Sequence, residues 1–460
     1  LSGFPVSNPP RLGGFETGKP PLGRPLAVGG GRARRAGGGR RIVLAMHGDE
    51  MTAASPGPPP ATGAWRPGDP AGQRRFLTLF APPDGPLELE LGGTLSPVVV
   101  AYETWGELDR AGSNAVLVAH ALTGDSHAAG PAGPGHRYPG WWDHSIGPGK
   151  DIDTNRWFVV CPNVLGGCQG TTGPSSPAPD GQPYGSRFPR ITIRDQVAVE
   201  AAMADALGIE RWAAVIGGSM GGMRALEWAV GHPDRLGLAV VVACGAAASA
   251  EEIGLCSVQN EAIRADPGFR DGDYYDAAPG DGPHRGMGIA RRIGHLSYRS
   301  EPELQARFGR AAQPGEDPLG GATAPAEAEG PGAGAEHGRY AVESYLDHHA
   351  DKLARRFDAG SYVVLSEAMN HHDVGRGRGG LAQALGAVRC RVAVAGIDSD
   401  RLYPLRLQQE LAELLPGRPE VTVISSLYGH DSFLIESEAV GNFIRAALED
   451  DAAGAEERAG

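Results

Sequence analysis

Residues 212–230 read WAAVIGGSMGGMRALEWAV, in which an apolar run ending at Ile216 meets an apolar-periodic segment beginning at Gly222. The turn between them is rich in glycine and carries Ser219. This is the G-x-S-x-G pattern between a strand and a helix, where small neighbours permit a sharp turn that exposes the serine hydroxyl. The pattern predicts a nucleophilic serine, and the alternative is a glycine-rich turn with an incidental serine. A phosphate-binding loop is excluded, because no lysine follows the glycines and G-x-G-x-x-G is absent here.

Short apolar runs alternate with amphipathic segments on both sides of this turn. The runs expected to form buried strands are 114–120, 157–160, 212–217, 236–243, 390–396 and 421–425. The segments with helical periodicity are 192–207, 222–230 and 435–448. Strands that alternate with helices of this length predict an α/β fold, with a mostly parallel sheet and helices on both faces.

The domain organisation follows from where this alternation stops. We expect the α/β core in residues 71–246 and 385–450. The intervening residues 247–384 are mainly helical in pattern and show no strand periodicity, which predicts a helical lid inserted into the core. Inside the lid, residues near 320–338 read GGATAPAEAEGPGAGAEHG, and this low-complexity composition predicts a disordered loop.

Both ends of the chain are expected to be disordered. Residues 1–70 are rich in Gly, Pro and Arg, and such a stretch cannot offset its ordering entropy by burial. Met51 opens a more ordinary N-terminus, so we interpret residues 1–50 as a start-site artefact. Residues 451–460 are predicted to be a disordered C-terminus.

Composition and charge exclude several classes of protein. The formal net charge of −13 argues against nucleic acid as a partner. No apolar run reaches the roughly 18 residues that a membrane-spanning helix needs, so no membrane partner is expected. Five cysteines in 460 residues are too few, and odd in number, for a disulfide framework. A reducing compartment is consistent with that usage, and we expect the protein in the cytoplasm.

A serine nucleophile needs a base, and the base needs an acid that orients it. In this strand–turn–helix context the chain order is serine, acid, histidine, with the last two on loops after late strands. The loop after the expected strand 390–396 contains Asp398 and Asp400, and both are candidates for the acid. His430 follows the next strand, where Gly429 suits a tight turn that brings the imidazole over the sheet edge.

Acyl chemistry also needs two backbone N–H donors to bind an oxyanion. One is expected at Met220, directly after the nucleophile, and the other at Leu122, two residues past the end of the strand 114–120. The alternative for the second donor is that residues 120–124 only connect strand and helix.

No metal site is expected. The histidine pairs 348–349 and 371–372 lack two histidines one helical turn apart, which is the spacing that a helical metal site uses. Cys161 and Cys168 have no second pair near them in the sequence, so we interpret them as ordinary buried thiols.

Taken together, these motifs resemble the homoserine O-acetyltransferase family, an acyl-CoA-dependent branch of the α/β-hydrolase fold. The segment NVLGGCQGTTGPSS (163–176) is more specific than the serine turn, since plain hydrolases lack it. The resemblance covers residues 75–448, and its matching segments are HALTGDSH (120–127), GWWDHSIGPGKDIDTNRWFVVCPNVLGGCQGTTGPSS (140–176), GGSMGGMRALEWA (217–229), ARRIGHLSYRS (290–300), YAVESYLDHHADKLARRFDAGSY (340–362), SDRLYP (399–404) and YGHDSF (428–433).

The resemblance implies a ping-pong acyl transfer in methionine biosynthesis. Ser219 would attack the thioester of the co-substrate acetyl-CoA, with His430 as base, and the acetyl group would pass to the hydroxyl of L-homoserine. Asp400 would be the orienting acid, because it lies four residues before Pro404, the family's usual spacing; Asp398 remains the alternative. No permanently bound cofactor is expected.

The same resemblance implies two residues that bind the amino acid. An arginine in the lid helix and the aspartate after the histidine correspond to Arg291 and Asp431. Helical periodicity places Arg292 nearer the apolar face, so the choice of Arg291 depends on its position in the Ala-Arg-Arg motif. Family members are homodimers joined through the lid, and we expect the same here.

Other functions stay open. The same chemistry with succinyl-CoA as donor, or with serine or deacetylcephalosporin C as acceptor, depends on pocket side chains that the sequence does not place. A carboxylesterase would hydrolyse short esters without stimulation by an amino acid. A non-catalytic binding protein on this scaffold would not be labelled at Ser219 by a fluorophosphonate.

Overall fold

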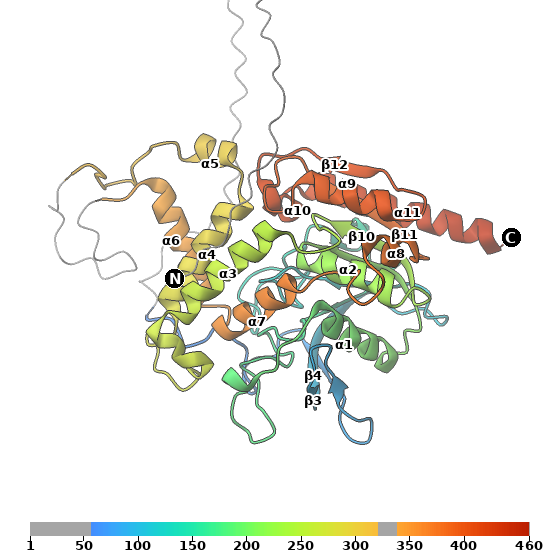
Figure 1. Ribbon diagram of the computed structural model, residues 1–460, viewed down its shortest axis with the longest axis horizontal. Helices are drawn as coiled ribbons and strands as arrows, with labels where there is room; N and C mark the ends of the chain where they lie inside the picture. The colour runs from blue at the N-terminus through green and yellow to red at the C-terminus, as the bar shows by residue number, and fades with distance from the viewer. Residues whose placement is uncertain (1–56, 321–337, 460) are drawn as a thin grey trace, which may run out of the picture. The chain divides into compact units, whose positions relative to one another are not determined.

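The computed structural model describes residues 57–320 and 338–459, with side chains up to residue 450. Its main sheet has eight strands in the order β1, β4, β8, β5, β9, β10, β11, β12. Figure 1 labels β4, β10, β11 and β12 of this sheet. From β8 to β12 all neighbouring strands are parallel, whereas β4 pairs antiparallel with both β1 and β8. The mostly parallel sheet is therefore confirmed. Its strands are Arg75–Leu79 (β1), Val98–Trp105 (β4), Ala115–Ala119 (β5), Phe158–Pro162 (β8), Trp212–Gly218 (β9), Leu236–Val242 (β10), Arg391–Ile397 (β11) and Val421–Ile424 (β12).

The central strands are buried on both faces, and successive side chains enter two separate cores. Leu117 and Val215 pack in the core that includes residues of α1 and α2. Val116 and Ile216 pack in the other core, which includes Ile444 of α11. Helices on both faces of the sheet are therefore confirmed. The helices around the sheet are α1 (Ile193–Ala206), α2 (Met220–Gly231), α9 (Leu405–Leu414), α10 (Ser432–Ile435) and α11 (Ser437–Ala459).

A helical insertion separates β10 from β11. Its described residues contain no strand, and α4 packs against both α3 and α6 at the left of Figure 1. The insertion contains α3 (Ala250–Arg264), α4 (His284–Tyr298), α5 (Glu301–Arg307), α6 (Ala341–Ala354), α7 (Ala359–Asn370) and α8 (Leu381–Gly386). Most of the loop predicted near 320–338 lies outside the described residues. Within the ranges that the structure describes, no helix is long and apolar enough to cross a membrane.

Short elements complete the chain. Two-stranded ladders join β2 to β3 and β6 to β7, and three 3₁₀ turns lie on the connections. These elements are Leu87–Glu88 (β2), Thr94–Leu95 (β3), Ile146–Gly147 (β6), Ile152–Asp153 (β7), Gly185–Arg187 (η1), Pro267–Gly272 (η2) and Gly429–Asp431 (η3).

Two predicted boundaries of disorder are wrong. Residues 57–70 belong to the folded body: Thr62 donates a hydrogen bond to Asp358 at 2.7 Å, and the Trp65 N–H donates to Cys168 O at 2.9 Å. The high proline content of this segment led us to expect disorder, although these hydrogen bonds hold it on the folded body. At the other end, α11 continues to Ala459, where we expected disorder from residue 451. Alanine and glutamate dominate that segment, and both favour a helix. Residues 1–56 lie outside the described part.

Candidate active site

Ser219 sits at the junction of β9 and α2 in a strained backbone conformation. Its φ of 57° and ψ of −126° lie in a region that non-glycine residues rarely adopt. The chain on both sides fixes this conformation: the Ser219 N–H donates a hydrogen bond to Val242 O at 3.0 Å, and α2 begins at the next residue. The predicted strand–turn–helix geometry therefore places the hydroxyl at the N-terminus of α2.

The glycines around Ser219 permit a close approach of backbones. A Cβ on Gly217 would overlap the backbone of Gly221, and a Cβ on Gly221 would overlap the carbonyl oxygen of Ala119 at the end of β5. Only glycine fits at these two positions, so the first turn of α2 lies directly against the end of the neighbouring strand. This contact sets the distance between Ser219 and the loop that follows β5.

Asp400, and not Asp398, contacts the predicted base. His430 Nδ1 lies 2.7 Å from Asp400 Oδ2, and both side chains are buried. The other carboxylate oxygen, Oδ1, accepts hydrogen bonds from the backbone N–H groups of Leu402 and Tyr403 at 2.9 and 2.8 Å. Asp398 is exposed and accepts a hydrogen bond from the Ser426 N–H instead.

The surroundings of His430 favour its protonated form. Burial lowers the pKa of His430, but the charge and hydrogen bond of Asp400 raise it, with further contributions from Asp431 and Glu252. The net direction is upward from the ordinary histidine value. Because Nδ1 is bound to Asp400, Nε2 is the ring nitrogen left to exchange a proton with a hydroxyl group.

One cavity of about 90 Å³ brings the predicted site residues together. Asp400 lies behind His430 and Met220 is fully buried beside Ser219; neither lines the cavity. The cavity wall includes Ala121, Leu122, Thr123, Ser219, Glu252, Arg291, Tyr298, His430, Asp431 and Phe433. Segments from both halves of the core and from the helical insertion thus meet around a single space.

The two expected oxyanion donors have backbone N–H groups available. Neither the Leu122 N–H nor the Met220 N–H donates to an acceptor within the part of the chain that the structure describes. Met220 is the first residue of α2, so its N–H has no partner inside the helix. Free donors at a helix start favour a developing negative charge on a ligand oxygen.

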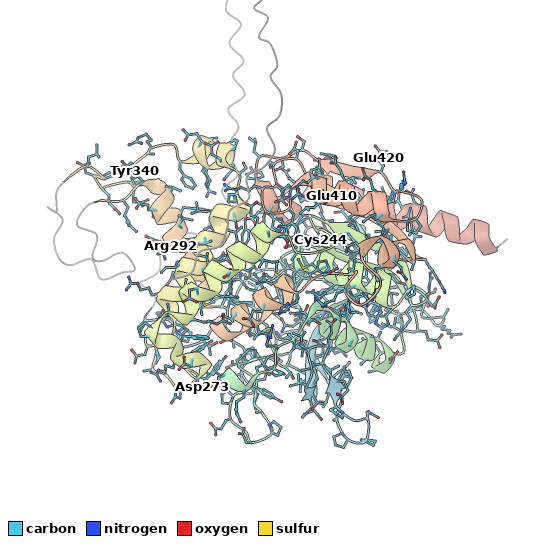
Figure 2. The ribbon with its side chains drawn as sticks, in the orientation of Figure 1. Cys244, Asp273, Arg292, Tyr340, Glu410 and Glu420 are labelled. Atoms are coloured by element: carbon cyan, nitrogen blue, oxygen red, sulfur yellow. The ribbon has the colours of Figure 1, made fainter. Side chains whose placement is uncertain are left out.

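Arg291 and Arg292 lie next to each other on α4 but have different partners. Arg292, which is labelled in Figure 2, forms an ion pair with Asp347 of α6 at 2.6 Å. Arg291 lines the cavity, its guanidinium lies 5.9 Å from the Tyr298 ring centre, and its buried Nε has no hydrogen-bond partner. Within the described residues, no carboxylate forms an ion pair with Arg291. This contrast supports the motif-based choice of Arg291.

Asp431 is partly exposed and forms an ion pair with Arg299, an arginine of the helical insertion. Its Oδ2 lies 3.5 Å from Arg299 Nη1, and 21% of the Asp431 side chain is accessible. Arg299 also donates to Glu303 at 2.7 Å, so Asp431 is not its main partner. The Asp431 carboxylate therefore remains available to a cationic group in the cavity.

Sequence reasoning missed Glu252, a buried acid in the same cavity. Its Oε2 accepts a hydrogen bond from the Ser249 N–H at 2.6 Å in the capping box of α3, while Oε1 is buried and has no partner among the described residues. Burial raises the pKa of Glu252 to about 7. The Ser-x-x-Glu pattern at 249–252 predicts a helix start, but it gives no sign that the helix start borders the catalytic histidine candidate.

A second cluster, Glu103 with His127 and His136, has ligand atoms within 4.8 Å of one another. The two imidazole rings stack at 3.8 Å with an interplanar angle of 11°. Lone pairs in the planes of stacked rings run side by side and do not converge on one ion. His127 Nδ1 bonds to Glu103 at 2.8 Å, and His136 Nε2 accepts from the Gln73 N–H at 3.1 Å. This arrangement fits a hydrogen-bonded pair better than a metal chelate.

Replacing Glu252 by glutamine is expected to stabilise the protein in a pH-dependent way. An acid whose pKa rises from 4.5 to about 7 on folding lowers the stability as pH rises through that window. Glu252→Gln should therefore gain roughly 3 kcal/mol at pH 8 and under about 1 kcal/mol at pH 5. Glutamine also suits the capping box. Urea unfolding at both pH values measures this difference, and Glu251→Gln, at the exposed neighbour on the same helix turn, is the control. An equal gain at both pH values would contradict the assignment.

Comparison with known proteins places the chain in a family. The family model of the α/β hydrolase fold matches residues 114–437. The homoserine O-acetyltransferase of Thermobifida fusca (strain YX) is 60% identical over 391 residues, which cover 85% of this chain and 98% of that protein.

Solved structures agree with this placement. The homoserine O-acetyltransferase from Bacillus anthracis superposes with a TM-score of 0.70 at 27% identity, covering 82% of this chain and 97% of that one. Esterase E22 superposes with a TM-score of 0.70 at 26% identity, covering 82% and 99%. By its sequence and its fold, this chain belongs to the homoserine O-acetyltransferase family of the α/β-hydrolase fold.

Proposed function

We propose that the chain transfers the acetyl group of acetyl-CoA to the side-chain hydroxyl of L-homoserine, through an acyl-enzyme on Ser219, in methionine biosynthesis. The observation that carries the proposal is the cavity that Ser219 and His430 line together with Arg291, an arginine that forms no ion pair within residues 57–320 and 338–450. The family placement supports acetyl-CoA as the donor and L-homoserine as the acceptor. Ser219, His430 and Asp400 are the proposed catalytic residues.

In the first half-reaction, Ser219 Oγ attacks the thioester carbonyl carbon while His430 Nε2 takes the hydroxyl proton. Asp400 holds the Nδ1 proton and stabilises the imidazolium that forms. The carbonyl oxygen becomes an oxyanion that accepts hydrogen bonds from the N–H groups of Leu122 and Met220. When the tetrahedral intermediate collapses, the carbon–sulfur bond breaks and His430 gives its proton to the leaving thiolate.

In the second half-reaction, the acceptor hydroxyl replaces the serine hydroxyl. His430 removes its proton, the hydroxyl oxygen attacks the acetyl carbonyl, and Ser219 leaves with a proton returned by His430. L-Homoserine is a zwitterion, so a cavity that excludes water must supply one cation and one anion. We assign its α-carboxylate to Arg291, whose planar fork can donate two parallel hydrogen bonds, and its α-ammonium to Asp431.

A second candidate function is ester hydrolysis. The proposed nucleophile, base and oxyanion donors would serve a water acceptor equally well, and the similarity to esterase E22 favours testing it. The two functions differ in whether an amino acid accelerates turnover. Succinyl-CoA as donor, and serine or deacetylcephalosporin C as acceptor, are alternatives within the transferase function.

We also propose a homodimer joined through the helical insertion, which would form the lid. The insertion helices expose large apolar side chains: Ile253 and Val258 on α3 and Leu296 on α4 are 41%, 58% and 43% accessible. Apolar side chains this exposed are candidates for a self-association surface. We place the protein in the cytoplasm, because Cys161, Cys168, Cys244 and Cys256 are buried free thiols.

The proposed function predicts thiol release from acetyl-CoA that L-homoserine accelerates. Ser219→Ala should lose roughly 10⁴-fold or more, even without the acceptor, because no other nucleophile replaces the serine. The measurement is free thiol over time with acetyl-CoA or succinyl-CoA, each alone and with homoserine or serine. Mass spectrometry of the wild type with acetyl-CoA alone should find one acetyl group on the peptide that contains Ser219. Release that no amino acid accelerates would favour the esterase.

Asp400→Asn is expected to be inactive, whereas Asp398→Asn keeps most of its activity. Because Oδ1 of Asp400 accepts two backbone hydrogen bonds, an asparagine would keep its oxygen there and turn its NH₂ group toward His430 Nδ1. The imidazole would then carry its proton on Nε2 and could not act as base, a loss of about 10⁴-fold in comparable triads. Steady-state rates of the two variants test this; the reverse order would make Asp398 the acid.

Arg291→Ala and Asp431→Asn should each weaken homoserine use by roughly 2–5 kcal/mol, the usual result of leaving one buried charge unpaired. Acetylation of Ser219 should survive, since it does not involve the amino acid. Rapid mixing with acetyl-CoA would show a burst of one CoA per subunit, then a slow rate that no longer responds to homoserine. Arg292→Ala, which loses only the pair with Asp347, is the matched control. Loss of the burst would overturn the acceptor assignment.

A further inference from the structure

Arg224 is a fully buried arginine on α2 whose guanidinium has two partners on different elements. Nη1 donates to Glu200 Oε1 on α1 at 2.8 Å, and Nη2 donates to the carbonyl oxygen of His120 at 2.8 Å. The other oxygen of Glu200 accepts a hydrogen bond from Trp228 Nε1 at 2.8 Å. The Arg224 side chain is thus bonded to α1 on one side and to the residue that follows β5 on the other.

This bond joins the two segments that carry the proposed oxyanion donors. Arg224 lies four residues after Met220 on the same helix, and His120 lies two residues before Leu122. The oxyanion hole therefore depends on the relative position of α2 and the loop after β5. Arg224 is the side chain that spans from one to the other, beside the backbone contact between Gly221 and Ala119.

His120 transmits this constraint to the loop. Burial lowers the pKa of His120 to about 3, so the imidazole is neutral. Its Nε2 accepts a hydrogen bond from the Val164 N–H at 3.0 Å, which leaves Nδ1 to donate to Ala121 O at 2.8 Å. At the far end, Arg356 Nη1 donates to Thr123 O at 2.8 Å. The carbonyl groups on both sides of Leu122 are thereby fixed, while its N–H faces no protein acceptor in the described residues.

We propose that Arg224 is a positioning residue for the oxyanion hole: through the His120 carbonyl it sets the distance between the Leu122 and Met220 N–H groups. The inference rests on the proposed function, which assigns the oxyanion to those donors. A buried ion pair is by itself weak evidence of a stabilising role, whereas a displacement of about 1 Å in an active site can lower a rate 10²-fold. Arg224 therefore acts on the transition state and leaves binding of the donor unchanged.

The test replaces Arg224 while keeping the helix. Arg224→Met leaves Glu200 as an unpaired buried charge, so the double variant Glu200→Gln/Arg224→Met is compared with Glu200→Gln alone. The matched control is Trp228→Phe, which removes a hydrogen bond to Glu200 in the same network and does not touch His120. For folded, soluble protein, rapid mixing with acetyl-CoA gives the acylation rate and its dependence on acetyl-CoA concentration.

We expect the double variant to acylate ten- to a hundredfold more slowly than Glu200→Gln, with an unchanged half-saturating concentration of acetyl-CoA. An alkylboronic acid, whose adduct with serine is tetrahedral and places an oxygen on the same donors, should bind more weakly by a similar factor. Trp228→Phe should lower the melting temperature but keep the acylation rate and boronate affinity.

Equal acylation rates in the double variant and Glu200→Gln would overturn the inference. It would also be overturned if Trp228→Phe lowered the acylation rate along with the melting temperature. A slower rate with unchanged boronate affinity would also overturn it, because the oxyanion donors would then be intact. Failure of the proposed function is a distinct outcome: the wild type would show no acetylation of Ser219, whatever residue stands at position 224.

Discussion

The contact between the first turn of α2 and the end of β5 constrains most of this site. Where a Cβ at Gly221 would meet the Ala119 carbonyl oxygen, the two backbones can approach only because the side chain is missing. That approach fixes the strained turn at Ser219 and brings the proposed oxyanion donors, Leu122 and Met220, to the same side of the serine. The hydrogen bonds of the buried Arg224 side chain to Glu200 and to the His120 carbonyl oxygen reinforce the contact.

The charges around the cavity form a second constraint. His430 is buried, which lowers its pKa, yet three nearby acids raise the pKa in the net balance. The partner with the shortest contact is Asp400, whose second oxygen is held by two backbone N–H groups. A carboxylate held in this way cannot turn away from the imidazole when the proton moves. Glu252, one oxygen of which has no partner in the described part of the chain, adds a negative charge that varies near neutral pH.

Much of the fold could be predicted from the sequence, because strands buried on both faces read as unbroken apolar runs. The expected run at 236–243 became β10, and the run at 212–217 became β9. β1 and β4 were missed: β1 alternates between exposed and half-buried side chains, and β4 contains the buried Glu103, which breaks its apolar pattern. Both strands lie on the antiparallel side of the sheet.

The site was harder to predict where it depends on tertiary contacts. Chain order indicated Ser219 and His430, and the resemblance favoured Asp400 by its spacing to Pro404. Residue order alone left Asp398 open, because both aspartates lie on the same loop and only the folded chain shows which one contacts His430. Glu252 was missed because the Ser-x-x-Glu pattern at 249–252 indicates a helix start but does not indicate whether that helix start borders a cavity. The tail boundary was wrong because hydrogen bonds such as that of Thr62 with Asp358, 296 residues apart, leave no local signal.

The difference between transfer and hydrolysis lies in the acceptor side of the cavity. The proposed nucleophile, base and oxyanion donors would release an acyl group to water or to an alcohol alike. Arg291 is the proposed acceptor-binding feature: within the described residues its Nε is buried without a hydrogen-bond partner beside an aromatic ring, so the guanidinium loses hydration without gaining an anion. In the proposed function, the carboxylate of an amino acid would supply that anion, and the hydroxyl of the same amino acid would lie toward His430. An arginine that has no ion pair within the described residues is therefore the reason why we propose an amino-acid acceptor over water.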